Sequence, residues 1–162
     1  LETNTFALLH EIESVMRFPI SEKCLEFKVQ CKTSVPDTIF TDPTRLKQCL
    51  QNLLANAVKF THTGHVHLNV RFIRQQKNGF IVYDIEDTGI GIPQDKLSSV
   101  FEEFTQADTS TTREYGGTGL GLTITQKMTE LMGGRISVQS EIARGTTFSI
   151  TMPIGKASKT AF

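Results

Sequence analysis

The chain has 162 residues, with 17 Lys and Arg against 17 Asp and Glu, so its formal net charge is zero. A domain of this size can bury a core without disulfides or metal ions. The balanced charge argues against nucleic-acid binding, because such proteins carry a basic excess that neutralises phosphates. No stretch approaches the roughly 20 apolar residues of a membrane span, and the three widely spaced cysteines fit reduced thiols. We therefore expect residues 1–162 to form a single cytoplasmic α/β domain.

The first 60 residues predict two helices separated by a strand. Apolar residues recur at helical spacing over residues 6–18, and Pro19 is expected to follow the end of that helix. Residues 24–31 alternate between apolar and polar side chains, which is typical of a half-buried strand. Asp42 can cap the next helix and Pro43 suits its first position, so a helix is predicted from Pro43 to about Phe60.

The remainder of the chain predicts four strands and one more helix. Two strands, 65–73 and 79–86, are joined by a polar turn, as in a hairpin. Residues 94–116 are mostly polar, and a loop of that length is usually functional or disordered. A helix over 119–132 ends at two glycines. Strands over 135–140 and 147–153 follow, and the tail 155–162 is expected to be frayed.

The common nucleotide-binding motifs are absent from this sequence. The only Gly-Lys pair, Gly155-Lys156, lacks both the first glycine and the hydroxyl residue of a P-loop. The run from Gly89 reads Gly-Ile-Gly-Ile-Pro-Gln, so it lacks the third glycine of the dinucleotide motif. The catalytic signatures of the common protein kinases are missing as well.

A first candidate site lies on the predicted helix after Pro43. Asn52, Asn56 and Lys59 are spaced i, i+4 and i+7, which places them on one helix face. An amide oxygen is a hard ligand suited to Mg²⁺, and a lysine one turn away offers a positive charge to phosphates. The alternative is that these three residues simply form the solvated face of an amphipathic helix.

A second candidate is the segment from Asp87 to Pro93. Strand alternation places Asp87 on the same side as Tyr83 and Ile85, so its carboxylate would be buried and would need a hydrogen-bond donor. An adenine amino group could supply that donor, and two glycines would let the backbone approach a flat ring. The alternative is an ordinary β-turn after a strand, begun by an aspartate.

A third candidate is the glycine-rich run from Gly116 to Leu122, which leads into a predicted helix. Free backbone amides at a helix start can bind phosphate oxygens. The alternative is a flexible hinge.

Taken together, these segments resemble the ATP-binding catalytic domain of a sensor histidine kinase. That domain belongs to the superfamily shared with gyrase, the mismatch-repair ATPase and the ninety-kilodalton heat-shock chaperone. Five motifs carry the resemblance, in order over residues 42–150: Asn52–Phe60 resembles the N box, Asp87–Pro93 the G1 box, Phe101–Phe104 the F box, Gly117–Leu122 the G2 box and Gly145–Phe148 the last G box.

The resemblance implies a fold and a set of residue roles. The fold is an α/β two-layer sandwich, a mixed sheet with helices on one face and a mobile ATP lid over residues 94–116. Asn56 would hold Mg²⁺ with Asn52 beside it, Lys59 would contact phosphates, Asp87 would accept from the adenine amine and Thr146 would support it through water. The other implied ATP-binding residues are Gly89, Gly91, Ile92, Arg113, Gly117, Thr118, Gly119, Leu120, Gly121 and Leu122.

Asn52 favours a kinase over an ATPase. ATPases of the superfamily carry a glutamate one turn before the metal asparagine, where it activates water, and an amide cannot act as a general base. The resemblance therefore implies transfer of the γ-phosphoryl group of ATP to a histidine on a separate dimerisation domain, and from there to a response-regulator aspartate. Two rivals stay open: a nucleotide-binding scaffold without transfer, and a serine kinase or ATPase of the same superfamily.

The phosphoacceptor histidine itself is not expected within this chain. His10-Glu11 begins like the acceptor box but continues without its basic residue and proline, so His10 is interpreted as an ordinary helix residue. His62, His65 and His67 flank a turn and a strand and form no convincing metal set. The chain is interpreted as the catalytic module of a longer kinase and is expected to be monomeric when isolated. The parent kinase could be membrane-anchored. The lid sequence resembles that of hybrid kinases, which carry an attached receiver domain.

Overall fold

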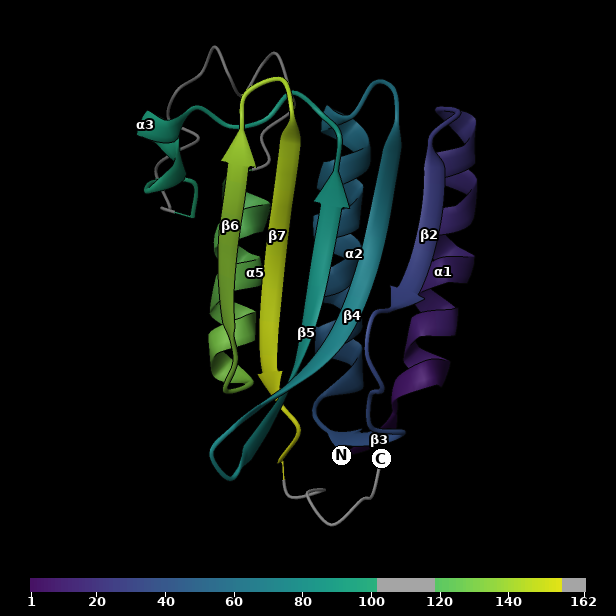
Figure 1. Ribbon diagram of the computed structural model, residues 1–162, viewed down its shortest axis with the longest axis vertical. Coiled ribbons are helices and arrows are strands. Elements are labelled where there is room, and N and C mark those ends of the chain that lie inside the picture. Colours follow the sequence, from purple (N-terminus) through teal and green to yellow (C-terminus); the bar gives the residue numbers. More distant parts are fainter. Residues whose placement is uncertain (102–118, 156–162) are drawn as a thin grey trace.

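A five-stranded mixed sheet covered on one face by three long helices forms the body of the protein (Figure 1). The computed structural model describes residues 1–101 and 119–155. The predicted two-layer α/β architecture is confirmed. Among the described residues, no helix has the length and apolar character needed to cross a membrane.

The elements follow one another much as the sequence predicts. Their bounds are β1 (Glu2–Asn4), α1 (Thr5–Glu22), β2 (Glu26–Cys31), β3 (Thr38–Phe40), α2 (Pro43–Phe60), β4 (His65–Gln75), β5 (Asn78–Asp87), α3 (Gln94–Leu97), α5 (Gly119–Leu131), β6 (Arg135–Glu141) and β7 (Gly145–Pro153). Most of the residues expected to form the lid, and all but the first residue of the expected frayed tail, lie outside the described residues.

Helix α1 is longer than its sequence pattern predicts, because it continues through Pro19 to Glu22. The proline ring removes one backbone donor, which would otherwise bond to the carbonyl of Val15. Val15 is more than half exposed, so water can satisfy that carbonyl. Met16 and Ile20 are buried on either side of the proline, and their packing holds the last turn in helical form.

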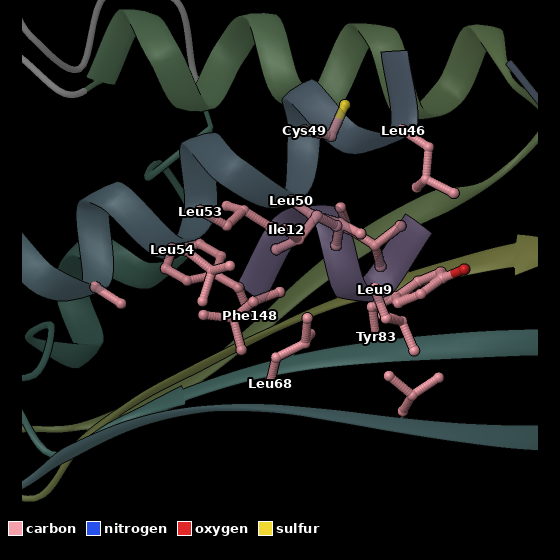
Figure 2. Packing of buried hydrophobic residues seen from close by; sticks show 14 of the residues in the cluster. Leu9, Ile12, Leu46, Cys49, Leu50, Leu53, Leu54, Leu68, Tyr83 and Phe148 are labelled. Atoms are coloured by element: carbon pink, nitrogen blue, oxygen red, sulfur yellow. The ribbon is translucent and has the colours of Figure 1, made fainter. Parts of the chain in front are cut away.

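Helix α2 is the centre of the helical layer, with α1 on one side and α5 on the other. Asp42 caps it by accepting from the backbone amide of Arg45 at 3.2 Å, and Pro43 occupies its first turn, as predicted. Its apolar side chains fill the space between helices and sheet (Figure 2). The fully buried members are Leu46, Cys49, Leu50, Leu53 and Leu54.

The sheet order is β2-β4-β5-β7-β6. Only the β2–β4 pair is parallel, and the other neighbours are antiparallel. Side chains alternate along each strand, so Leu68, Tyr83 and Phe148 point toward the helices (Figure 2). Their neighbours form the opposite face, which none of the three long helices covers (Figure 1).

Three further local features differ from the prediction. The short antiparallel pair β1–β3 was not predicted, because three-residue strands give almost no periodic signal. Strand β2 begins at Glu26 rather than at residue 24, since Cys24 has a φ of 59° and lies in the turn after α1. The segment expected to be a lid begins with the short helix α3, and Val100 beyond it is buried in the core.

Candidate functional site

Several elements end or begin at the same end of the sandwich, the upper end in Figure 1. Helix α2 and strand β5 finish there, and β7 starts there. Helix α5 also starts toward this end, directly after the residues that are not described. The topology therefore brings together the N-box, G1-box and last G-box segments that lie far apart in the sequence.

Asp87 is a buried carboxylate at the last position of β5, with 7% of its surface exposed. It lies on the same strand face as Tyr83 and Ile85, as the alternation predicts. Its Oδ1 accepts from the backbone amides of Gly89 at 2.9 Å and Thr146 at 3.2 Å. Burial raises the pKa of Asp87, while these two amides act in the opposite direction. No donor among residues 1–101 and 119–155 reaches Oδ2, so this oxygen can accept from a ligand.

The loop after β5 is held between α2 and the β6–β7 turn. The amide of Ile90 donates to the carbonyl of Phe60 at 3.2 Å, and its own carbonyl accepts from Ala143 at 2.9 Å. A Cβ on Gly89 would collide with the carbonyl of Phe60, and one on Gly91, whose φ is 79°, with the backbone of Glu141. Glycine is therefore required at both positions so that the loop can approach its neighbours closely.

Ser140 organises this loop, although it belongs to none of the sequence motifs. Its Oγ accepts from the backbone amide of Ile92 at 2.7 Å and lies 2.9 Å from the carbonyl of Gly145. It is also 2.8 Å from the hydroxyl of Thr146, its cross-strand partner in the β6–β7 hairpin. The hairpin register around residues 143–145 could have revealed this pairing. Thr146 is thereby fixed beside Asp87.

The polar face of α2 ends beside this loop. Asn52 and Asn56 are half-buried and Lys59 is exposed. Neither asparagine side chain has a hydrogen-bond partner within the described parts of the chain, so their amide oxygens can still serve as ligands. Neutral oxygen donors suit Mg²⁺, which keeps several waters and binds beside phosphates. The side chains of Asn52 and Asn56 therefore fit the Mg²⁺ ion that the family resemblance implies.

Only some of the remaining predicted ATP-binding residues are described by the structure. Gly119, Leu120 and Gly121 form the first turn of α5, and Leu122 is buried in the core. Arg113, Gly117 and Thr118 lie outside the described residues.

Residues 41–156 match the family described as histidine kinase-, DNA gyrase B-, and HSP90-like ATPase. The chain belongs to this family. Among curated members, LuxQ of Vibrio vulnificus strain YJ016, an autoinducer 2 sensor kinase/phosphatase, is 39% identical over 94% of this chain and 18% of LuxQ. BarA of Escherichia coli K12, a signal transduction histidine-protein kinase, is 44% identical over 91% of this chain and 17% of BarA. The chain thus spans less than a fifth of these relatives.

Solved structures of histidine kinases share the fold. Full-length ShkA in complex with AMPPNP superposes with a TM-score of 0.80 at 29% identity, covering 99% of this chain and 32% of ShkA. The nucleotide-free catalytic domain of ThkA superposes with a TM-score of 0.71 at 25% identity, covering 95% of each chain. The predicted fold class and the family resemblance are both confirmed.

Proposed function

We propose that this domain binds Mg-ATP and delivers the γ-phosphoryl group to a histidine on a separate dimerisation and phosphoacceptor domain, for onward transfer to a response-regulator aspartate. The observation that carries the proposal is Asp87. It is a buried carboxylate with one oxygen held by two backbone amides and the other open to a donor. The family match and the AMPPNP complex of ShkA support a nucleotide as the ligand.

Asp87 would recognise the base by accepting from the adenine amino group. A fixed, partly desolvated acceptor discriminates well, because a base without the donor leaves the carboxylate unpaired. Thr146 would assist through a bridging water, held in place by its contact with Ser140. Gly89 and Gly91 would support the pocket indirectly, because their close packing on the backbone of Phe60 and Glu141 holds the loop that follows Asp87 in place.

The polar face of α2 would act on the phosphates. Asn56 would hold Mg²⁺, which would neutralise phosphate charge, and Asn52 would lie one turn away. Lys59 would add a positive charge. Since Asn52 cannot take a proton from water, this site would favour transfer to an incoming side chain over hydrolysis. Catalysis would then rest on positioning and charge neutralisation. Arg113, Gly117 and Thr118 would complete the phosphate site from residues that are not described.

The acceptor histidine would come from another domain of the same kinase, with a receiver domain as the next partner. His10 is exposed on α1 and lies outside the candidate site. We expect the isolated domain to be monomeric, and light scattering that shows a stable dimer would contradict this.

Calorimetric titration with a non-hydrolysable ATP analogue, with and without Mg²⁺, tests the binding site. We expect micromolar affinity for the wild type and loss of binding in Asp87→Asn. Asp84→Asn is the matched control, because Asp84 lies on the same strand but pairs with Arg71 and Ser149 on the opposite face. Equal affinities in wild type and Asp87→Asn would overturn the assignment of Asp87.

Phosphotransfer is tested with labelled ATP and a purified phosphoacceptor hairpin from a histidine kinase. We expect label on the hairpin that is lost in acid, because phosphohistidine is acid-labile and phosphoserine is not. Asn56→Ala should abolish labelling. Acid-stable label would indicate a serine kinase. Analogue binding with phosphate release but no labelling would indicate an ATPase, and binding with neither would indicate a scaffold.

A further inference from the structure

Two histidines and two glutamates meet on the open face of the sheet, away from the helices. The parallel register of β2 and β4 places Glu26 beside His65, and the antiparallel register of β4 and β5 places His67 beside Glu86. All four positions alternate with residues that face the core, so their side chains share the open face. We call these four residues the imidazole–carboxylate cluster.

The two imidazoles of the cluster are held against each other. They lie two residues apart on one strand, about 6.6 Å between Cα atoms, and so project in parallel. Their rings stack with centroids 3.9 Å apart and planes inclined by 16°. His67 is 13% exposed at its side chain and His65 27%, so both rings are partly withdrawn from solvent.

Each ring also faces a carboxylate from a neighbouring strand. His67 Nε2 lies 2.9 Å from Oε2 of Glu26, and His65 Nε2 lies 2.6 Å from Oε2 of Glu86. Oε2 of Glu86 is also 3.9 Å from Nδ1 of His67. The hydrogen bond from His67, followed by the charge of Lys28, lowers the pKa of Glu26. Three strands thus contribute to one compact group.

The spacing of these atoms is close to that of a metal site. Ligand atoms of Glu26, His65 and His67 all lie within 4.8 Å of one another. In a tetrahedral zinc site, with bonds of 2.0–2.1 Å, ligand atoms are about 3.4 Å apart. Small side-chain rotations close this difference, and two of the three side chains start from rigid strand positions on β4. Two imidazoles and one carboxylate form an established zinc ligand set that leaves a fourth position open.

We propose that the cluster binds one divalent transition-metal ion of the zinc type through His65, His67 and Glu26. Glu86 hydrogen-bonds His65 and orients its ring, as carboxylates do around metal-bound imidazoles. The bound ion joins the edge strand β2 to β4 and raises the stability of that edge. This site is separate from the candidate nucleotide site, because Glu86 and Asp87 are adjacent in sequence but point to opposite faces of the sheet.

Titration of the nucleotide-free chain with zinc chloride in magnesium-free buffer tests the proposal. We expect one ion per chain, bound with micromolar affinity, and a rise in melting temperature. His65→Gln and His67→Gln should each weaken binding by at least about tenfold and remove the stabilisation. His62→Gln is the matched control, since His62 is an exposed histidine close in sequence to His65 but not part of the cluster, and this variant should bind zinc as the wild type does.

Two further variants test whether zinc binds instead at the exposed cysteines or at Asn56. Cys24 precedes β2 and Cys31 is its last residue, and both are exposed free cysteines outside the cluster, so the double variant Cys24→Ser/Cys31→Ser should keep full binding. Asn56→Ala should also keep it. The absorption spectrum of bound Co²⁺ should lack a thiolate charge-transfer band. No binding to the folded wild type, binding that survives His67→Gln, or binding that disappears in the cysteine variant overturns the proposal.

Discussion

Burial raises the pKa of the Asp87 carboxyl above its ordinary value of 3.8, even though two backbone amides donate to it. The ionised form is therefore unfavourable for folding relative to the protonated form. This penalty is absent below pH 3.8 and fully present once the pH exceeds the folded-state pKa. Asp87 thus lowers the stability of the domain at neutral pH.

Asp87→Asn should separate stability from binding. The asparagine oxygen can keep both bonds from Gly89 and Thr146, and it carries no charge at any pH. We expect its free energy of unfolding to match that of the wild type below pH 3.8, to exceed it increasingly as the pH rises above 3.8, and to level off above the folded-state pKa of Asp87. Urea denaturation at several pH values measures the difference. A variant less stable than the wild type at neutral pH would show that the carboxylate is favourable in the fold.

The hydroxyl group of Tyr83 allows a second test of how a buried polar group affects stability. This hydroxyl is buried and has no hydrogen-bond partner among residues 1–101 and 119–155, and burial raises its pKa. Tyr83→Phe should leave the free energy of unfolding unchanged or raise it by up to about 1 kcal/mol, because it removes an unpaired polar group. Tyr83→Ala should lower the free energy of unfolding by about 3–5 kcal/mol. This variant is the positive control, which shows that the measurement responds to changes at this position. A clear loss in Tyr83→Phe would reveal a partner for the hydroxyl.

At the scale of elements, the β6–β7 turn determines how β7 meets the end of β5. Gly145 has a φ of 118°, and a Cβ there would collide with the carbonyl of Asp87. Gly133, at the end of α5, also has a positive φ of 85°, but a Cβ there would meet only Pro153 at 3.7 Å. The two glycines therefore share the backbone requirement and differ in the space around them.

Alanine at these two glycines should separate strain from steric overlap. Gly133→Ala should cost about 1–2 kcal/mol from backbone strain alone. Gly145→Ala should cost a further 1–3 kcal/mol or so from overpacking, and it should also weaken nucleotide binding. Chemical denaturation and analogue titration measure both. Equal costs at the two positions would mean that the turn can move away from Asp87.

At the scale of the whole molecule, a single core connects the three long helices to the sheet. Leu68 of β4 is 0% exposed within it, whereas Leu131 at the end of α5 is 78% exposed. Leu68→Ala should lower the free energy of unfolding by about 2–5 kcal/mol, and Leu131→Ala by less than about 0.5 kcal/mol. Far- and near-ultraviolet circular dichroism should follow one transition in each variant. Separate transitions would show that sheet and helices unfold independently.

Sequence by itself determined the elements whose signals are local. The cap and proline of α2, the alternation of β5 and the glycines of its following loop are read from neighbouring residues, and the structure confirms the elements they predict. The order of the motifs was enough to identify the family, which residues 41–156 confirm. The ligand roles of Asn56, Lys59 and Asp87 stay predictions.

Tertiary structure decided the features that depend on residues distant in the chain. Helix α1 continues past Pro19 because its last turn packs on the core, which no local propensity reports. Ser140 contacts Ile92 because β7 pairs with both β5 and β6. Glu26 meets His67 across 41 positions because β2 lies parallel to β4. Local patterns specify helices and strands, but strand register sets which side chains of neighbouring strands meet, because each strand exposes only alternate residues to each face.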